Sequence, residues 1–396
     1  MTKVFFAGAR ASQWTAEQTK GGSEPRGSLK VGEYQATLDS DVVGAKAASG
    51  EKVHDEKTQE RSRHREMSTG AGQGAEKVRP DILTIREAQS FLAEYFSATR
   101  LIEAPYVSER AGKRVYLKLE AELPTGSFKV RGALWALATR LKRGRIEEVI
   151  ASSTGNHGAA VAYAAKLLGL RARIFLPVGC NPVKRGRIAS LGAAIVESGG
   201  ADLAAAFALA AEYAKRPGVY FLNDATDLDL PAGPGTIGCE ILEQLPDAGT
   251  IVVPMGDTAL IRGIAAAVKQ IAPRVRIVGV QAERAPAYFR SWQEDRVVGT
   301  ATCDTIADGL ATRTPDEANV HDIKSLVDDA LLVSEEQMLG AIEILLVEEH
   351  VLAEPAGAAS TAALLNARPD FGDKVVLVVS GANISRDVLR RAVGAV

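Results

Sequence analysis

The sequence has few cysteines and little net charge. Its 396 residues include three cysteines, an odd number at widely spaced positions, which suits a reducing compartment and does not form a metal-ligand pattern. The five histidines show no metal-ligand spacing either, so no metal site is predicted. The formal net charge of −2 comes from mixed signs, so neither nucleic acid nor an anionic membrane is expected as a partner.

Long apolar runs are also absent. No run of 18 apolar residues occurs, and the N-terminus lacks the uninterrupted apolar segment of a signal peptide, so we expect a cytoplasmic protein. Residues 1–80 contain two leucines and no isoleucine, too few apolar side chains to offset the entropy of ordering the segment. This stretch is predicted to be a disordered extension, and Met67 is an alternative start of the natural chain.

From about Asp81 onward the sequence alternates between strand and helix patterns. Thr84 to Glu87 resembles a capping box, which predicts a helix through Phe91, Tyr95 and Phe96. A second capping box at 334–337 predicts a long helix to about 349. Strands are predicted at 115–120, 149–151, 173–176, 194–196, 219–221, 250–253, 276–280 and 375–379, and further helices at 182–191, 203–214, 238–245, 260–271 and 384–393. Repeated strand and helix patterns predict parallel sheets with helices on their faces, an α/β fold.

Binding sites in open α/β sheets form at the carboxyl ends of the strands, so the residues after each strand are candidates. Lys129 follows the 115–120 strand at a loop-to-helix junction, where a partly desolvated amine can lose its proton and attack a carbonyl. The spacing alone favours the alternative, a surface lysine in a turn. The Ser152–Gly158 stretch places hydroxyls, an amide and glycines at a helix N-terminus, which can hold a carboxylate. Simple N-capping is the alternative, and His157 is either a base or a packing residue.

Two other strand ends carry weaker signals. The loop at 254–263 can hold a phosphate on backbone N–H groups, although Asp257 would repel an anion and a plain connecting loop is the alternative. Ser380, after the 375–379 strand, offers a hydroxyl to a heteroaromatic nitrogen, but alone it is an ordinary turn residue.

Six stretches match the motifs of one known family in the right order. They are PTGSFKVRGA at 124–133, STGNHG at 153–158, AGPGTIGCEILEQLPD at 232–247, TIADGLAT at 305–312, EPAGAAS at 354–360 and SGANIS at 380–385. Together they resemble the fold-type II pyridoxal-phosphate enzymes, specifically the threonine/serine dehydratase group, from about Asp81 to the C-terminus. Leu123-Pro124 and Lys129-Val130-Arg131 differ from the Asn-Pro and Lys-Asp-Arg of cysteine synthase and its β-replacement relatives, which favours the dehydratase branch.

The resemblance implies a two-domain fold similar to the tryptophan synthase β subunit, with parallel sheets and helices on both faces. Residues 81–148 and 225–396 would form the large cofactor-binding domain, and 149–224 the small domain with the substrate loop. A homodimer is implied as well. Because 13 residues follow Asn383, no regulatory domain and no isoleucine feedback are expected.

The same resemblance assigns roles to residues around the cofactor, pyridoxal 5'-phosphate. Lys129 would form the internal Schiff base and then transfer protons, Phe128 would lie beside the pyridine ring, and Ser380 would hydrogen-bond its nitrogen. The phosphate cup would consist of Gly256, Asp257, Thr258, Ala259 and Leu260. The substrate carboxylate would be held by Ser153, Thr154, Gly155, Asn156 and His157, with Asn156 also near the cofactor's phenolic oxygen and Gly309 lining the pocket.

The implied activity is that of an ammonia-lyase, or dehydratase. It would remove water and ammonia from a β-hydroxy amino acid such as L-threonine or L-serine and release a 2-oxo acid. A neutral serine at the ring nitrogen suits elimination better than transamination. The alternatives are a β-replacement enzyme and a non-catalytic ligand-binding descendant on the same fold.

The sequence departs from this family at several positions. The cup has Asp257 where the family usually has glycine, which leaves cofactor affinity in doubt unless the carboxylate points away or pairs, with Arg262 as the candidate. Gln281 and Ala287 stand where members that bind a divalent cation have acidic residues, so that site is expected to be lost. Thr154 replaces the serine of racemases, so racemisation is not expected.

Overall fold

The computed structural model describes residues 79–180, 182–200, 203–366 and 370–394. All of them belong to one compact unit, which spans residues 72–396. The predictions of disorder for residues 1–80 and of an alternative start at Met67 concern a stretch of which residues 1–78 lie outside the described residues.

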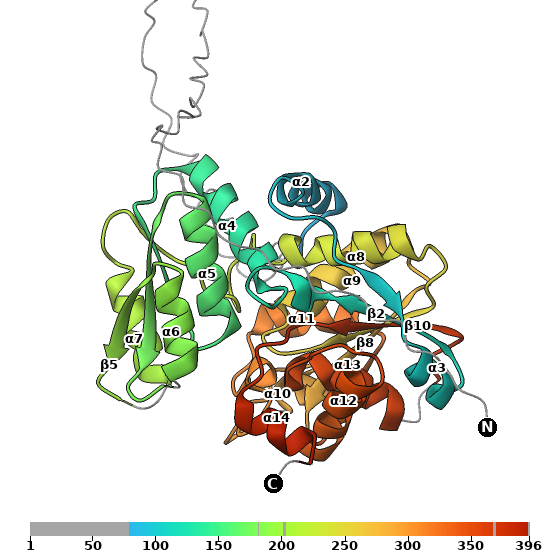
Figure 1. The fold of residues 1–396 in the computed structure, drawn as a ribbon. Coiled ribbons are helices and arrows are strands. Elements are labelled where there is room, and N and C mark those ends of the chain that lie inside the picture. Colours follow the sequence, from blue (N-terminus) through green and yellow to red (C-terminus); the bar gives the residue numbers. More distant parts are fainter. Residues whose placement is uncertain (1–78, 181, 201–202, 367–369, 395–396) are drawn as a thin grey trace, which may run out of the picture. The chain divides into compact units, whose positions relative to one another are not determined.

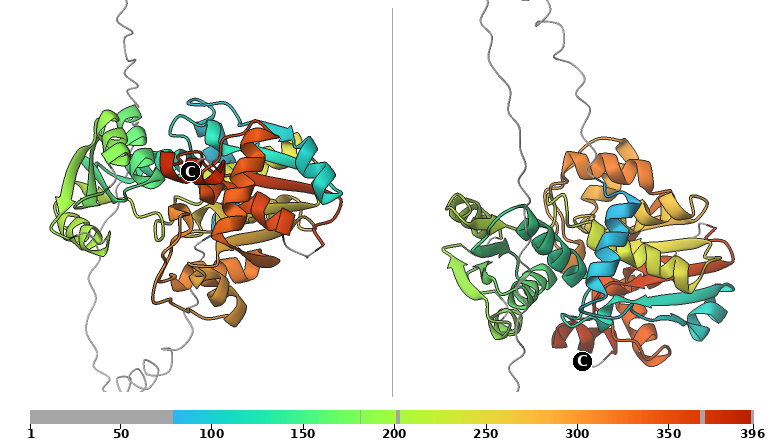
Figure 2. Two further views of the ribbon diagram at one scale, coloured as in Figure 1. Left: turned by 60° about the horizontal axis from the view of Figure 1, so that its bottom comes forward. Right: turned by 90° about the horizontal axis from the view of Figure 1, so that it is seen from above.

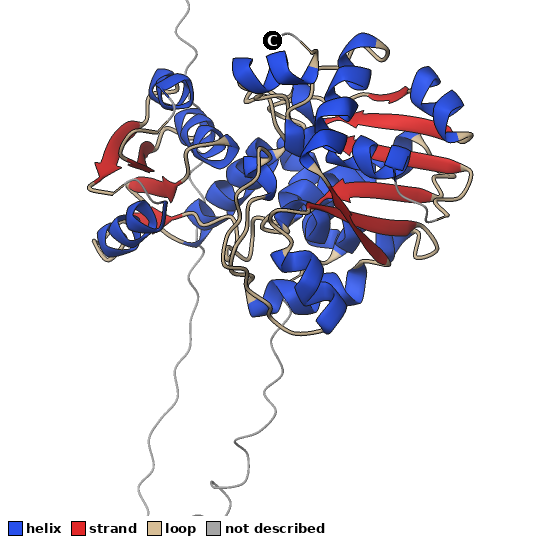
Figure 3. Cartoon of the chain, turned by 90° about the horizontal axis from the view of Figure 1, so that it is seen from below, coloured by secondary structure: helices blue, strands red, loops and turns tan. Residues whose placement is uncertain are grey.

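Two β-sheets form the framework of this unit (Figures 1 and 3). The larger sheet has the strand order β1-β2-β10-β7-β8-β9 and the smaller one the order β5-β4-β3-β6. The strands are β1 (Leu101–Glu103), β2 (Arg114–Leu119), β3 (Glu148–Ser152), β4 (Arg171–Pro177), β5 (Ala194–Ser198), β6 (Val219–Phe221), β7 (Thr250–Pro254), β8 (Arg276–Ala282), β9 (Asp329–Val333) and β10 (Lys374–Val379). Neighbouring strands run parallel except β1, which is antiparallel to β2, so the α/β fold with parallel sheets is confirmed apart from this edge strand.

Helices cover both faces of the larger sheet (Figures 1 and 2). One face packs against α2 (Ile82–Leu92), α8 (Ala232–Gln244), α9 (Ala259–Ile271), α10 (Ala287–Glu294) and α11 (Glu317–Leu326). The other packs against α3 (Pro105–Ala111), α12 (Glu335–Val347), α13 (Pro355–Asn366) and α14 (Arg386–Ala392). The smaller sheet packs against α4 (Lys129–Arg143), α5 (Asn156–Leu167), α6 (Pro182–Ser190) and α7 (Leu203–Tyr213). Two short 3₁₀ turns, η1 (Glu120–Glu122) and η2 (Asp308–Leu310), complete the elements.

Strand β10 shows why the sequence predicts a strand buried on both faces. Val376 and Val378 belong to the core formed with α8 and α9, whereas Val375 and Leu377 belong to the core formed with α12 and α13. All four side chains are fully buried. Burying an aliphatic side chain contributes about 1.5–3 kcal/mol, so both faces of this strand hold the layers together.

The first described helix differs from its prediction. Its N-cap is Asp81 and not Thr84, because the Asp81 carboxylate accepts a hydrogen bond from the Thr84 N–H at 2.7 Å. The helix ends at Leu92, so Tyr95 and Phe96 lie beyond it. The second capping box is confirmed, with the Ser334 side chain accepting from the backbone of Gln337 at 3.2 Å and the Gln337 side chain accepting in return at 2.9 Å. Its helix, α12, ends at Val347, slightly before the predicted end.

Helix α8 begins at Ala232, well before the predicted start at 238. Sequence rules treat the glycines of this stretch as helix breakers, but here they permit close packing. A Cβ on Gly235 would lie 2.9 Å from Ile85 of α2, and one on Gly263 of α9 would lie 2.3 Å from the Pro231 carbonyl oxygen. Glycine therefore lets three helices approach each other at this point. The elements β1, α3, α10, α11, β9 and α13 were not predicted at all.

Candidate active site

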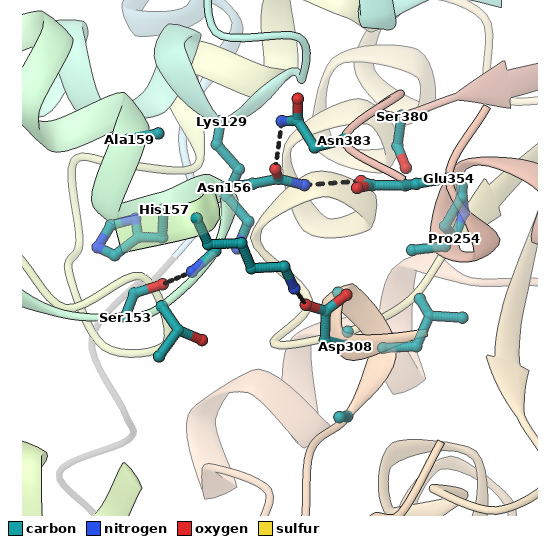
Figure 4. Close-up of a pocket in the computed structure, with 18 of the residues that line it drawn as sticks. Lys129, Ser153, Asn156, His157, Ala159, Pro254, Asp308, Glu354, Ser380 and Asn383 are labelled. Atoms are coloured by element: carbon teal, nitrogen blue, oxygen red, sulfur yellow. Dashed lines mark hydrogen bonds and ion pairs between the residues drawn. The ribbon is translucent and has the colours of Figure 1, made fainter. Parts of the chain in front are cut away.

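A cavity of about 920 Å³ opens at the carboxyl ends of strands from both sheets (Figure 4). All of the predicted site residues line it: Phe128, Lys129, Ser153, Thr154, Gly155, Asn156, His157, Gly256, Asp257, Thr258, Ala259, Leu260, Gly309 and Ser380. The cavity therefore brings together stretches that are far apart in the sequence. The roles assigned to these residues remain predictions.

Lys129 is the first residue of α4, at the loop-to-helix junction predicted for it. The loop before it is tied to the end of β10, because the Phe128 N–H donates to the Ser380 carbonyl at 3.0 Å and Ser127 pairs with Gly381. These contacts bring the Lys129 amine and the Ser380 hydroxyl into one pocket. The Lys129 side chain is only 15% exposed, and its Nζ lies 2.5 Å from Oδ2 of Asp224.

The charges around Lys129 determine its protonation. Burial acts to lower the pKa of the amine, but the carboxylates of Asp224 and Asp257 outweigh this effect, and the pKa of Lys129 is raised above its ordinary value. Burial would raise the pKa of Asp224, but His157 and Lys129 reverse that effect and hold it well below its usual range. The two groups therefore form a buried ion pair.

Asp224 was missed at the sequence level. It lies in the connection between β6 and α8, directly beyond the carboxyl end of a strand that the sequence did predict. The rule that found the other site residues, namely to inspect the residues after each strand, would have found this one too.

The Ser153–His157 loop leads into α5, with Gly155 as N-cap. The Gly155 N–H donates to Ser153 Oγ at 3.3 Å, and the first N–H groups of α5 have no partner within the helix, so they are available to an anion. His157 is buried, and its Nε2 lies 2.9 Å from the Leu222 carbonyl oxygen. Because a carbonyl can only accept, Nε2 carries the proton. The other ring nitrogen, Nδ1, lies 3.8 Å from Asp224 and has no hydrogen-bond partner among the described residues.

Asn156 connects the Ser153–His157 loop to residues that flank helix α13 and strand β10 (Figure 4). Its amide donates to Glu354 Oε1 at 2.6 Å, and its carbonyl oxygen accepts from the Asn383 amide at 2.6 Å. Burial, followed by the nearby Asp308, raises the pKa of Glu354 to about 7. Glu354 and Asn383 lie in two of the quoted motifs, but the sequence reasoning gave them no role. At the rim of the cavity Asp308 forms an ion pair with Lys184.

The predicted phosphate cup has the geometry of an anion cradle. The chain turns through Thr258, whose φ of 67° is left-handed, and α9 begins at Ala259, so the N–H groups of its first turn face the cavity end of the helix. Gly256 is packed so closely that a Cβ would lie 2.1 Å from the Gly309 carbonyl oxygen. Only glycine fits at this point of the loop.

Asp257 does not pair with Arg262, the candidate partner that the sequence offered. Its Oδ1 accepts a hydrogen bond from the Thr312 hydroxyl at 2.7 Å. Arg262 instead donates to Thr258 Oγ1 at 3.1 Å and pairs with Asp322 of α11 at 3.3 Å. Burial, followed by repulsion from Asp224, raises the pKa of Asp257, which reduces the charge that a phosphate would meet.

These residues fit the cofactor that the sequence implies. The cavity offers an amine for an aldehyde, a helix N-terminus for a phosphate and a hydroxyl for a ring nitrogen. Ser152 Oγ also lies buried at the cavity without a hydrogen-bond partner among the described residues, so a donor or acceptor is free for a ligand.

A family model described as "pyridoxal-phosphate dependent enzyme" matches residues 92–381, most of the chain. The chain belongs to the pyridoxal-phosphate-dependent enzymes. Its cofactor is therefore pyridoxal 5'-phosphate, as predicted from the sequence.

Similar proteins place this pyridoxal-phosphate-dependent enzyme in the threonine dehydratase group. An L-threonine ammonia-lyase of Geobacter sulfurreducens is 38% identical over 301 residues, covering 76% of this chain and 75% of the relative. One of Thermotoga maritima is 37% identical over 309 residues, covering 78% and 77%. The crystal structure of a threonine deaminase from T.th. is 32% identical, has a TM-score of 0.72 and covers 77% of this chain and 99% of that one. Maize serine racemase is 29% identical, with a TM-score of 0.73 and coverage of 79% and 97%.

The described residues of this pyridoxal-phosphate-dependent enzyme contain neither a membrane span nor a metal cluster. No helix in that part of the chain is both long and apolar enough to cross a membrane. No group of three or more His, Cys, Asp or Glu side chains among the same residues could hold a metal ion. Gln281 stands where the sequence predicts that a cation site has been lost. Its side chain accepts a hydrogen bond from the Phe289 N–H at 2.8 Å.

Proposed function

We propose that this chain is an ammonia-lyase that removes water and ammonia from a β-hydroxy amino acid, such as L-threonine or L-serine, and releases a 2-oxo acid. The observation that carries the proposal is the meeting of Lys129, the α5 N-terminus, the α9 N-terminus and Ser380 in one cavity. The named activities of the relatives, L-threonine ammonia-lyase and threonine deaminase, support the same reaction class.

When bound, pyridoxal phosphate supplies an electron sink for the charge left on the substrate α-carbon. Lys129 would hold the cofactor and later move the α-proton on its Nζ. The first-turn N–H groups of α9 would hold the phosphate, and the Ser380 hydroxyl would face the ring nitrogen. Since serine is neutral, it would leave that nitrogen mostly unprotonated, which favours prompt expulsion of the β-hydroxyl.

The substrate carboxylate would lie on the Ser153–His157 loop, where free N–H groups and the α5 dipole favour an anion. Asn156 is held on both sides, by Glu354 and by Asn383, so its amide is fixed before substrate enters. Such preorganisation reduces the entropy lost on binding.

The two-domain division, a homodimer and a cytoplasmic location belong to the same proposal. The division into residues 81–148 with 225–396 and residues 149–224 is supported by the smaller sheet, whose strands all lie between Glu148 and Phe221, although α4 of the first part packs against this sheet. All three cysteines are unpaired, as a reducing compartment favours. The homodimer rests on the resemblance to the family.

The test is an absorption spectrum of the purified protein with pyridoxal phosphate, recorded before and after adding L-threonine, L-serine and other 3-hydroxy amino acids. A visible band that changes with one substrate while 2-oxo acid accumulates is the expected result. Lys129→Ala should lose both the band and turnover, because Lys184, the other lysine among the described residues that line the cavity, is paired with Asp308. Turnover retained in Lys129→Ala would sink the assignment.

The products distinguish a β-replacement enzyme from a dehydratase. The reaction is run with and without an added thiol. A dehydratase forms the same 2-oxo acid in both cases, whereas a β-replacement enzyme converts the thiol into a new amino acid. Absence of any band after cofactor addition would favour the ligand-binding alternative.

A further inference from the structure

Three side chains from separate elements form a chain of contacts inside the cavity. Lys129 Nζ lies 2.5 Å from Asp224 Oδ2, and the same oxygen lies 3.8 Å from Nδ1 of His157. They come from the start of α4, the β6–α8 connection and the start of α5. Asp224 therefore touches the amine that would carry the cofactor and also faces the imidazole beside it.

The turn that carries Asp224 is held in place. The Asn223 side-chain oxygen accepts a hydrogen bond from the Ala225 N–H at 3.1 Å. The Asn223 backbone carbonyl accepts another from the Asp227 N–H at 2.9 Å. The Asn319 amide of α11 donates to the Ala225 carbonyl at 2.9 Å. The backbone on both sides of Asp224 is consequently held, and its carboxylate lies next to Lys129.

Other titratable groups face Lys129 but are engaged elsewhere. Asp257 accepts from Thr312, and Glu354 accepts from Asn156. His157 is turned by its Nε2 contact with the Leu222 carbonyl, which leaves Nδ1 toward Asp224. Among the described residues, Asp224 is the carboxylate in direct contact with the amine.

We propose that Asp224 is a positioning residue that sets the protonation of Lys129, both when the amine captures the cofactor and when it accepts the substrate α-proton. This inference rests on the proposed function for the role of Lys129. Its basis is the direct, buried ion pair, because an opposite charge at such a distance favours the ammonium form.

The ion pair has opposite effects on the two steps. For capture, Nζ first gives up one proton and then forms a bond to the aldehyde carbon of the cofactor. The aldehyde oxygen leaves as water, and a proton returns to the nitrogen of the new C=N bond. Asp224 disfavours the first proton loss and so slows capture near neutral pH. When Lys129 later accepts the α-proton, the same carboxylate stabilises the resulting ammonium and makes the amine a stronger base.

The experiment compares cofactor-free native protein with Asp224→Asn, which keeps the shape and removes the charge. Each is mixed with pyridoxal, which lacks the phosphate, across a pH series, and the growth of the visible band gives the capture rate. Opposite charges within about 4–6 Å commonly shift a pKa by about 1–3 units. The midpoint of the profile should therefore fall by at least about one unit in Asp224→Asn, which makes capture about tenfold or more faster at a pH below both midpoints.

The matched control is Asp229→Asn. Asp229 lies in the same β6–α8 connection, but it pairs with Arg143 at 2.5 Å and does not line the cavity. Its capture profile should coincide with that of the native protein. Asp224→Glu restores a carboxylate and should move the profile back toward the native one, and circular dichroism establishes that each variant is folded.

A second readout is the exchange of the substrate α-proton with deuterium, followed by NMR with the cofactor-loaded proteins. Asp224→Asn should slow this exchange even though it accelerates capture, a combination that a merely structural role would not produce. If the capture profiles of the native protein and Asp224→Asn coincide, this inference is overturned while the proposed function still stands. An equal shift in Asp229→Asn would also overturn it, and failure of the native protein to capture pyridoxal or its phosphate at any pH would overturn the proposed function with it.

Discussion

Replacing Glu354 by glutamine should make the protein more stable above neutral pH. Glu354 is 5% exposed and precedes α13, and burial together with Asp308 raises its pKa to about 7 from an ordinary 4.5. The folded protein thus binds this proton more tightly than the unfolded chain. The stabilisation from the protonated carboxyl is fully present below about pH 4.5 and is lost as the pH rises through about 7.

The size of this effect follows from the two pKa values. One pKa unit corresponds to about 1.36 kcal/mol, so the difference between 4.5 and about 7 corresponds to about 3 kcal/mol. Glutamine keeps an oxygen that can accept from Asn156 but does not titrate. The free energy of unfolding of Glu354→Gln should match that of the native protein near pH 4 and exceed it by about 3 kcal/mol near pH 8.

Urea unfolding of the cofactor-free proteins, followed by tryptophan fluorescence at several pH values, measures this difference. Taking the difference between the two proteins cancels the titration of all other groups. Glu343→Gln, at an exposed position of α12, is the matched control and should show a difference that does not change with pH. A pH-independent difference for Glu354→Gln would refute the reasoning.

Two further substitutions test the packing around the site. Arg131 is buried and pairs with Glu120 at 2.8 Å and Glu240 at 2.5 Å. Arg131→Met should leave these two buried carboxylates without their arginine and lower the free energy of unfolding, measured by urea titration, by about 3–5 kcal/mol. An unchanged unfolding midpoint would contradict this. Gly256→Ala would bring a methyl group 2.1 Å from the Gly309 carbonyl oxygen, so the loop must shift and pyridoxal phosphate should bind at least tenfold more weakly in an absorbance titration. Native-like affinity in that variant would show that the loop is not the cradle.

The sequence predicts this fold best where strands are buried on both faces. The run at 375–379 is continuous and apolar because helices cover both sides of β10, and it was found nearly to the residue. Strand β1 has three residues and packs at the edge, so it leaves no such run. Helix α13 consists largely of small buried residues on all sides, which removes the amphipathic period that marks a helix.

The candidate site was predictable where reactive side chains come after a long, buried strand. Lys129 and Ser380 come after β2 and β10, and the carboxyl ends of such buried strands predict binding residues. Asp224 comes three residues after β6, in a stretch that none of the quoted motifs covers. The partner of Arg262 could not be found, because Asp322 lies in a helix that was not recognised and is brought close only by the packing of α11 on α9.

The position of β10 has a consequence for synthesis of the chain on the ribosome. The smaller sheet is made entirely from Glu148–Phe221 and can assemble soon after that segment has emerged. The larger sheet cannot, because its gap between β2 and β7 is filled by Lys374–Val379, which is made only after all the other strands of both sheets. Until then two apolar strand edges stand open, and Ser380 is absent from the pocket. Completion of the cavity is thereby delayed until β10 and Ser380 have been translated.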